Sequence, residues 1–384
     1  MSDTAQPAAD PRPVDAEEIL DGILSWVHLE TPSHDAAAVN TLVDLVETDL
    51  RVHGARVDRL PGRDGWGDIL RARSPWGGDG PGVLFLGHLD TVHPIGTKAD
   101  VNPIRREDDK VFGPGIYDMK AGSYLGYNAY RHLARHGVET PLPMTLLLVS
   151  EEEVGSPISR EVIEAEAARA KYVLVAEPAR DGGKIVTARK GVARFDLEIT
   201  GRPSHAGSRH QDGRSAIREM AHQILALEAM TDYDRGVTVS VGMVHGGTAV
   251  NVVPFACRAE VDMRVPDGPT GDEMVARILG LAPVGPDVEV RVTGGLNRPP
   301  FEKGPGIAAL FDHARALAAE IGFELVDTHT GGGSDGNFTA ALGVPTLDGL
   351  GADGAGAHTH WEHILVSSLE PRARLLIRLM ETLR

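Results

Sequence analysis

Residues 144–156 read MTLLLVSEEEVGS, a run of apolar side chains followed by a serine, three glutamates and a glycine. A short, continuous apolar run of this kind is typical of a strand that is buried on both faces of a sheet. Two other runs have the same character, VLFL at 83–86 and YVLV at 172–175. Helical patterns lie between the runs, around 119–135 and 157–170, so the sequence predicts an alternating α/β sheet.

The pattern changes after about residue 188. The stretches ARFDLEITG, VTVSVGMVH and FACRAEVDMRV read as alternating or antiparallel strands, with helical stretches near 214–231 and 270–280. These features predict an inserted α+β domain. Before the first sheet, apolar residues at helical spacing predict amphipathic helices at 17–27 and 37–50.

After GGLNRPP the α/β pattern resumes, with a helix predicted at 305–321, a strand at 323–328 and an apolar run from 344. We therefore predict a discontinuous α/β domain that is closed by the C-terminal segment. Its two parts are residues 1–188 and 298–384, and the inserted domain occupies 189–297.

The composition limits the classes of function. A chain of 384 residues suggests two domains, and its formal charge of −17 opposes binding to nucleic acids and anionic membranes. No apolar run approaches the roughly 18 residues of a membrane span. The opening residues 1–15 have neither a basic start nor an apolar core, which indicates a flexible tail on a cytoplasmic protein. The single cysteine, Cys257, excludes internal disulfides and thiolate clusters, and we expect it in the core.

Each buried run ends in residues that can bind a metal. His88, Glu153 and Glu177 follow the three predicted strands, and the carboxyl ends of such strands meet at one edge of a sheet. Asp118 in GPGIYDMKAG and His358 in GAGAHTHWEH fit the same edge. Together the five residues form an N/O ligand set of the kind that zinc accepts.

Charge balance favours two metal ions over one. Three carboxylates around one divalent ion leave surplus negative charge in a partly buried site, whereas two divalent ions leave a single positive charge that a hydroxide cancels. Paired sites commonly share a bridging carboxylate. Asp118, which is short and lies on a glycine-rich loop, is predicted to be that bridge.

The sequence resembles the zinc exopeptidase and deacylase family that includes glutamate carboxypeptidases, aminoacylases, acetylornithine deacetylase and succinyl-diaminopimelate desuccinylase. The motifs that carry the resemblance span both predicted domains in order: GHLDTV at 87–92, GPGIYDMKAG at 113–122, SEEEVGS at 150–156, AEPA at 176–179, GRPSHAG at 201–207, GGSDGNF at 332–338 and AHTHWEH at 357–363. The run SPISREVIEAEAARAKYVLVAEPA is most similar to the glutamate carboxypeptidase branch.

This resemblance implies two zinc ions per chain, and cobalt or manganese also suits such ligands. His88 and Glu177 would complete one site and Glu153 and His358 the other, with Asp118 shared between them.

The resemblance also implies roles for two neighbours of these ligands. Asp90 would orient His88 through its second ring nitrogen. Glu152 would act as the general base toward the attacking water and later protonate the leaving amine. The alternative explanation for the three glutamates is a solvated acidic turn that caps the following helix.

In the inserted domain the resemblance assigns residues to dimerisation and substrate binding. His205 would reach into the partner's site of a homodimer and stabilise the tetrahedral oxyanion. Asn251 would polarise the carbonyl, and Arg264 would bind a substrate carboxylate. The alternative for Arg264 is an arginine on the surface of an edge strand. The backbone amides of Gly332, Gly333 and Ser334 would complete the pocket for the substrate carboxylate. Lys190 is a further basic residue that could bind a substrate side chain.

The predicted function is hydrolysis of an amide bond next to a free carboxylate in a small substrate, a peptide or N-acyl amino acid. The released amino acid would be glutamate, on the branch resemblance alone. Alternatives are an N-acyl-amino-acid deacylase and a non-catalytic metal- or amino-acid-binding protein. GGGSDG at 331–336 also satisfies a dinucleotide-binding pattern, but Asp335 inside that loop would repel a pyrophosphate.

Overall fold

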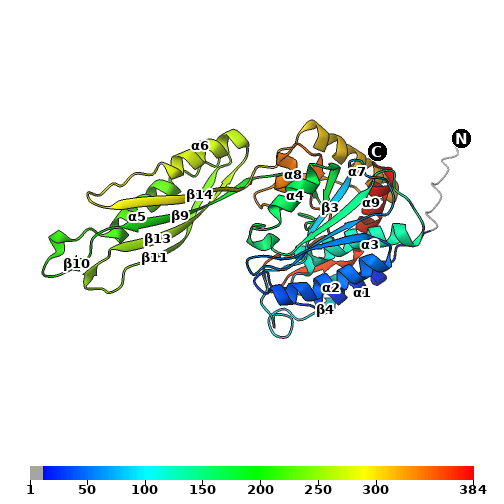
Figure 1. The fold of residues 1–384 in the computed structure, drawn as a ribbon, viewed down its shortest axis with the longest axis horizontal. Coiled ribbons are helices and arrows are strands. Elements are labelled where there is room, and N and C mark those ends of the chain that lie inside the picture. Colours follow the sequence, from blue (N-terminus) through cyan, green and yellow to red (C-terminus); the bar gives the residue numbers. More distant parts are fainter. Residues whose placement is uncertain (1–11) are drawn as a thin grey trace. The chain divides into compact units, whose positions relative to one another are not determined.

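The protein is described by a computed structural model that covers residues 12–384, and its elements form two compact units (Figure 1). Unit 1 contains the described residues of Met1–Thr187 with Gly304–Thr328 and Leu342–Arg384, and unit 2 contains Ala188–Lys303 and His329–Ala341. The chain therefore passes between the units four times.

Unit 1 is built around a six-stranded mixed sheet with the strand order β1-β2-β6-β3-β7-β16. Strands β6, β3, β7 and β16 are parallel to one another, whereas β2 is antiparallel to both β1 and β6. The predicted strands at 83–86, 145–149 and 172–175 are confirmed as β3 (Gly82–His88), β6 (Met144–Val149) and β7 (Ala170–Val175). Their apolar side chains are buried on both faces because helices cover the sheet.

The helices of unit 1 follow the predicted apolar spacing. Helix α1 (Ala16–Val27) begins after Asp15, whose side chain accepts a hydrogen bond from the Glu17 N–H, and α2 (Ala36–Val52) is capped in the same way by Asp35. The remaining helical elements of unit 1 are η1 (Ile116–Lys120), α3 (Ala121–Arg135), η2 (Glu152–Val154), α4 (Arg160–Ala167), α7 (Pro305–Ile321), η4 (Val366–Ser368) and α9 (Leu369–Thr382).

The other strands of unit 1 are short. They are β1 (Arg56–Leu60), β2 (Ile69–Arg73), β4 (Arg105–Glu107), β5 (Lys110–Phe112), β16 (Thr346–Leu347), β17 (Gly354–Ala355) and β18 (His363–Leu365). Strand β8 (Ile185–Arg189) pairs with β15 (Asp327–Thr330), and a boundary between the units runs through each of these two strands.

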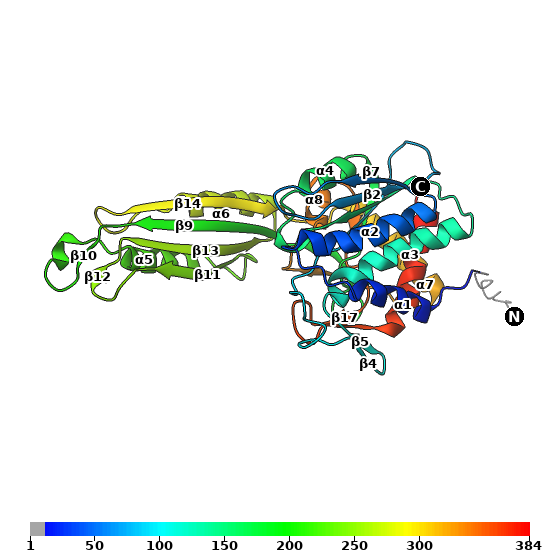
Figure 2. The same ribbon diagram turned by 60° about the horizontal axis from the view of Figure 1, so that its bottom comes forward.

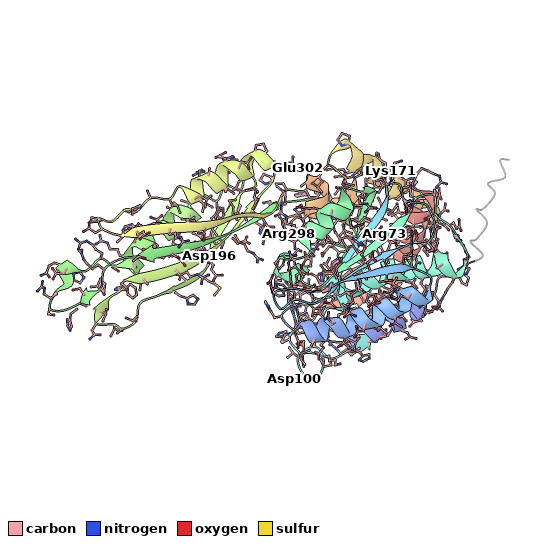
Figure 3. All side chains as sticks on the ribbon, in the orientation of Figure 1. Arg73, Asp100, Lys171, Asp196, Arg298 and Glu302 are labelled. Atoms are coloured by element: carbon pink, nitrogen blue, oxygen red, sulfur yellow. The ribbon has the colours of Figure 1, made fainter. Side chains whose placement is uncertain are left out.

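Unit 2 contains a four-stranded antiparallel sheet with the order β11-β13-β9-β14 (Figure 2). Along β9 and β13 buried and exposed residues alternate, because one face of the sheet is covered by α5 and α6 and the other is open. Charged pairs lie on the open face, for example Arg258 with Asp196 at 2.5 Å (Figure 3). Cys257 is buried in the core beneath the helices, as predicted.

The elements of unit 2 are β9 (Gly191–Thr200), β10 (Ser204–His205), η3 (His210–Asp212), α5 (Ala216–Glu228), β11 (Thr238–Gly246), β12 (Val252–Val253), β13 (Ala256–Val265), α6 (Gly268–Leu279), β14 (Glu289–Arg298) and α8 (Gly336–Ala341).

Two expectations differ from the structure. The strand predicted at 323–328 is wrong for most of its length, since β15 begins at Asp327. The block 298–384 is not assigned to one unit, because residues 298–303 and 329–341 belong to unit 2. Hydrogen bonds explain the second difference: the Asn337 side-chain amide donates to the carbonyls of Lys190 (3.1 Å) and Pro299 (2.7 Å).

The expected N-terminal tail lies mostly outside the described residues. Where the structure begins, Arg12 forms an ion pair with Glu381 at 2.7 Å, so the tail is anchored to α9 from this residue onward. Within residues 12–384, no helix combines the length and the apolar character that crossing a membrane requires.

Candidate metal centre

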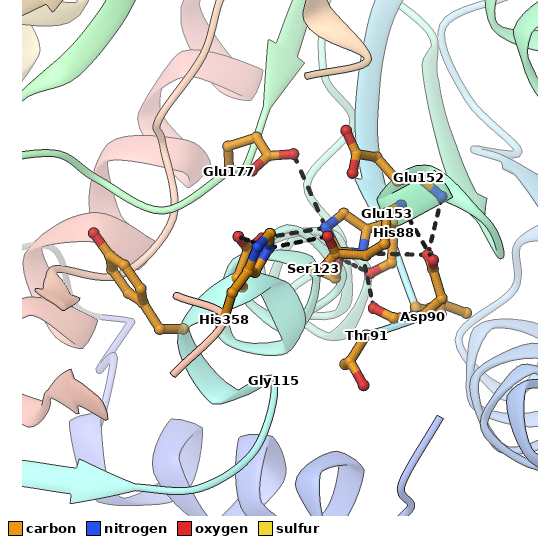
Figure 4. A network of polar contacts seen from close by, with 12 residues as sticks. His88, Asp90, Thr91, Gly115, Ser123, Glu152, Glu153, Glu177 and His358 are labelled. Carbon is orange, nitrogen blue, oxygen red and sulfur yellow. Dashed lines mark hydrogen bonds and ion pairs between the residues drawn. The ribbon is translucent and has the colours of Figure 1, made fainter. Parts of the chain in front are cut away.

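Three parallel strands bring candidate ligands to one edge of the unit 1 sheet. His88 is the last residue of β3, Glu152 and Glu153 lie on η2 just after β6, and Glu177 follows β7. Because β3 lies between β6 and β7 and is parallel to both, the three strand ends are neighbours (Figure 4).

Asp118 lies between two histidines. Its Oδ1 is 3.4 Å from Nε2 of His88, and its Oδ2 is 3.4 Å from Nε2 of His358. His88 Nε2 is also 3.9 Å from Glu177 Oε1, while His358 Nε2 is 3.0 Å from Glu153 Oε2. The structure thus brings together all five predicted ligands, and the two Asp118 oxygens face different histidines, as a bridging carboxylate requires.

Two sets of side chains place their ligand atoms within 4.8 Å of one another: His88 with Glu152 and Glu177, and His88 with Asp118 and Glu153. The first set includes Glu152, which the resemblance treats as a base and not as a ligand. Glu152 therefore lies close enough to the cluster to contact whatever is bound there.

The chemistry of the cluster suits a cation. Nε2 of His88 and Oε1 of Glu153 are buried and have no hydrogen-bond partner. Burial, together with the negative charge of Asp118, raises the pKa of Glu153 to about 8 in the protein alone. Hydrogen bonds to Asp118 and Glu153 raise the pKa of His358 to about 11, which places a proton among the carboxylates. Divalent cations would provide that positive charge, and the N/O donor set fits zinc.

Asp90 is fully buried and holds the η2 turn. Its carboxylate accepts hydrogen bonds from the Ser33 hydroxyl (2.6 Å) and from the backbone N–H groups of Glu152 (3.2 Å) and Glu153 (3.3 Å). The nearest Asp90 atom to Nδ1 of His88 is the main-chain oxygen, at 2.9 Å, and the carboxylate is 3.4 Å away. Asp90 therefore contacts the second ring nitrogen of His88, mainly through its backbone.

Glu151 has a different task from the two glutamates that follow it. It is fully buried, and its Oε1 accepts hydrogen bonds from the N–H groups of Ile158 (3.1 Å) and Ser159 (2.7 Å), at the start of α4. Its Oε2 accepts from the Ser150 N–H (3.2 Å) and hydroxyl (3.1 Å). The first of the three charges thus fixes the loop, and the other two face the cluster.

The predicted residues His205 and Asn251 belong to unit 2, whereas the cluster belongs to unit 1. His205 lies on the short strand β10, and its Nδ1 accepts hydrogen bonds from the N–H groups of Gly207 (3.1 Å) and Ser208 (3.2 Å). Neutral His205 therefore carries its proton on Nε2. Asn251 is exposed, and its main-chain carbonyl accepts a hydrogen bond from the N–H of Ala206, the residue after His205, at 2.9 Å.

Three of the candidate carboxylate-binding groups of unit 2 already have partners, namely the Arg264 guanidinium and the N–H groups of Gly332 and Ser334. Arg264 is paired with Asp262 through Nε at 2.7 Å. The N–H of Gly332 donates to Thr330 Oγ1 (3.3 Å), and the N–H of Ser334 donates to the Asn337 side chain (2.9 Å). Gly333, like Gly332, contributes a carbonyl oxygen to the Arg189 guanidinium.

The loop 331–336 lacks the features of a dinucleotide site. The helix that follows it, α8, has six residues, and Asp335 is buried in an ion pair with Arg298 at 2.6 Å. The loop is thus fixed by its own charges, and it offers no long helix N-terminus for a pyrophosphate.

Two residues outside the predicted set, Glu362 and Ser33, support the cluster. Glu362 is fully buried and contacts the loop that carries Asp118, whereas Ser33 contacts Asp90. The sequence signal for Glu362 was weak, a glutamate four residues after His358 within AHTHWEH.

The sequence matches the model of the peptidase family M20/M25/M40 over residues 84–382. The chain belongs to this family. Carboxypeptidase G2 of Pseudomonas sp. (strain RS-16) is 30% identical over 381 residues, which cover 98% of this chain and 90% of that protein. Succinyl-diaminopimelate desuccinylase of Delftia acidovorans (strain DSM 14801 / SPH-1) is 28% identical over 378 residues, which cover 91% and 94%.

A solved structure shares the M20 fold. The tripeptidase of Staphylococcus aureus subsp. aureus Mu50 superposes with a TM-score of 0.76 at 19% identity, covering 96% of this chain and 98% of that one. The M20 family is metal-dependent, in agreement with the His and carboxylate cluster. This M20 protein is a hydrolase that acts on C–N bonds.

Proposed function

We propose that this M20 hydrolase is a dizinc carboxypeptidase that cleaves an amide bond next to a free carboxylate and releases a C-terminal amino acid, with glutamate as the leading product. The observation that supports two ions is the position of Asp118, whose two oxygens each lie 3.4 Å from a different histidine. His88 and Glu177 would hold one ion, and Glu153 and His358 the other, with Asp118 shared.

Glu152 is the proposed general base. It is half-buried beside the cluster, and the N–H bond to Asp90 holds its backbone in place. When bound, the metal ions polarise the scissile carbonyl and lower the pKa of a water molecule. Glu152 then takes the proton of the attacking water and returns it to the leaving amine.

The proposed assembly is a homodimer formed by unit 2. Strand β11 is at the edge of its sheet, and edge strands present unpaired backbone groups to other chains. Met243 and Val244 on β11 are exposed apolar residues, and so is Leu225 on α5, a helix that contacts β11. In such a dimer His205 would enter the partner's site and donate Nε2–H to the oxyanion. Asn251, Arg264 and the loop of Gly332, Gly333 and Ser334 would contact the substrate.

A deacylase is the second candidate function, because the desuccinylase relative matches nearly as much of the chain as the carboxypeptidase does. The deciding experiment incubates zinc-loaded protein with N-acyl amino acids, dipeptides and folyl-type glutamates and identifies the released amino acids by mass spectrometry. Glutamate alone among the products would support the carboxypeptidase. Release of another amino acid would support the deacylase, and no release from any substrate would contradict both.

A further inference from the structure

We propose that Glu362 is a positioning residue that holds together three of the five segments bearing the predicted metal ligands. This inference rests on the proposed metal-dependent function. Glu362 contacts neither the predicted ions nor the substrate, and its side chain has no exposed surface. Its contacts nevertheless reach the loop that bears Asp118 and the segment that follows His88.

The carboxylate of Glu362 accepts four hydrogen bonds. Oε1 accepts from the backbone N–H groups of Tyr117 and Asp118, both at 2.8 Å. Oε2 accepts from the Gly115 N–H at 2.8 Å and contacts Nε2 of His93 at 2.6 Å. Three backbone donors of one loop thus converge on one buried side chain, and the last of them belongs to Asp118 itself.

The path of the loop 113–118 explains this convergence. Gly115 has φ = +68°, in the left-handed region, and a Cβ at this position would lie 2.2 Å from Cγ2 of Thr91. The left-handed turn allows the N–H groups of Gly115, Tyr117 and Asp118 to face the same side, which forms an anion-binding concavity. Glu362 fills the concavity with a carboxylate from a distant part of the sequence, and Asp118 therefore extends from a fixed backbone.

Glu362 also connects this loop with the segments that bear His88 and His358. It lies four residues after His358, and its own carbonyl accepts from the Gly113 N–H at 3.3 Å. His93 follows the ligand segment of His88 and is itself buried. One carboxylate therefore joins the segments 88–93, 113–118 and 358–363. This arrangement sets the distance between the two histidines and Asp118 before any ion binds.

The energetic consequence follows from burial. A fully buried carboxylate with four donors is stable only while those donors remain, and hydrogen bonds to charged groups are the strong ones. Replacing the carboxylate by an amide leaves at least one N–H group facing another N–H group. The loop of Asp118 would shift. Loss of a residue that holds a metal ligand in place typically changes metal affinity about 10- to 100-fold.

The test uses cobalt(II) as the probe, titrated into metal-free full-length protein and followed by its visible absorption. Glu362→Gln is compared with Glu370→Gln, the same substitution at a half-exposed residue of α9 that is paired with Arg374. We expect Glu362→Gln to retain its circular dichroism spectrum, to bind cobalt about tenfold more weakly and to show an altered absorption spectrum. We expect kcat to fall more than KM changes, and Glu370→Gln to behave as wild type.

A second variant protects the test against misfolding. His93→Gln removes one of the four contacts and should give a smaller loss of cobalt affinity in the same direction. Wild-type affinity and spectrum in Glu362→Gln would overturn the positioning role, and so would wild-type affinity in His93→Gln if Glu362→Gln does not fold. Failure of wild-type protein to bind cobalt would instead contradict the proposed function, so the two failures are distinguishable.

Discussion

At the scale of single residues, three adjacent glutamates have three different environments. Glu151 is fully buried and hydrogen-bonded to its own loop, Glu153 is buried beside His358, and Glu152 is half-buried at the edge of the cluster. The like charges are tolerated because backbone N–H groups neutralise the first and cations would neutralise the others. The difference in environment predicts different outcomes for the same type of substitution.

Glu152→Gln is predicted to lower kcat by a factor of about 100 to 10,000, because a general base contributes roughly that much. Metal content, measured by plasma mass spectrometry after dialysis, should remain near that of wild type. Glu161→Gln, an exposed glutamate of α4 that lies 3.5 Å from Arg63, is the control. Glu153→Ala is the contrasting variant and should lose metal as well as activity. Loss of metal in Glu152→Gln would make this residue a ligand and not the base.

At the scale of elements, Glu219 connects α5 to the loop before β14. It is buried, and it accepts hydrogen bonds from the N–H groups of Val284 and Gly285, both at 2.8 Å, and from the Gln223 side chain. Burial alone would raise the pKa of Glu219, but these hydrogen bonds outweigh it and the pKa is lowered. The carboxylate therefore stabilises the folded protein in its ionised form.

Glu219→Gln is predicted to reduce the free energy of unfolding by about 1.5–3 kcal/mol at pH 7, the typical value for hydrogen bonds to a charged group. A lowered folded-state pKa gives stability that is fully present above the unfolded value of 4.5 and is lost as pH falls through the folded value. The difference in the free energy of unfolding between wild type and Glu219→Gln should thus be constant at neutral pH and should become smaller below about pH 4.5. Urea unfolding of both proteins at several pH values measures this difference.

The exposed Glu289 on β14 provides a control for this series. Glu289→Gln should unfold like wild type at each pH. If the stability difference between wild type and Glu219→Gln became larger on acidification, the assigned downward shift of the Glu219 pKa would be contradicted.

Elements with strong local signals could be predicted from the sequence. The helix predicted at 305–321 is confirmed as α7, which starts at Pro305 and ends before Gly322 in a left-handed conformation. Such signals depend only on neighbouring residues. Strand β14 contains Gly294 and Gly295, which obscure its alternation, and it was not predicted. β15 was misplaced because a four-residue strand depends on its partner β8.

Some residues of the candidate site could also be predicted from the sequence, and others could not. His88, Glu153 and Glu177 could be predicted because each follows a buried strand, and parallel strands share an edge. The role of Glu362 could not, because it depends on three backbone N–H groups that converge only in the folded loop. The pattern of residue types along the chain does not indicate in which direction the backbone N–H groups of a folded loop point.

At the scale of the whole molecule, the proposed dimer predicts complementation between inactive variants. His205→Ala and Glu152→Gln should each be nearly inactive alone. If His205 acts in the partner's site, a mixed dimer contains one site with both intact residues, and random exchange should restore about a quarter of wild-type activity. The measurement is kcat after mixing, unfolding and refolding the two variants together. No recovery despite mixed dimers in native mass spectrometry would place His205 outside the partner's site.

The four passages of the chain between the units affect how the protein responds to proteases. Unit 2 is formed from Ala188–Lys303 and His329–Ala341, so neither unit is a single stretch of polypeptide. One cut at any junction leaves three covalent connections, and neither unit is released. Limited proteolysis at the junctions should therefore nick the chain without separating it under native conditions. An isolated copy of unit 2 would have to include both of its segments, joined by a new linker.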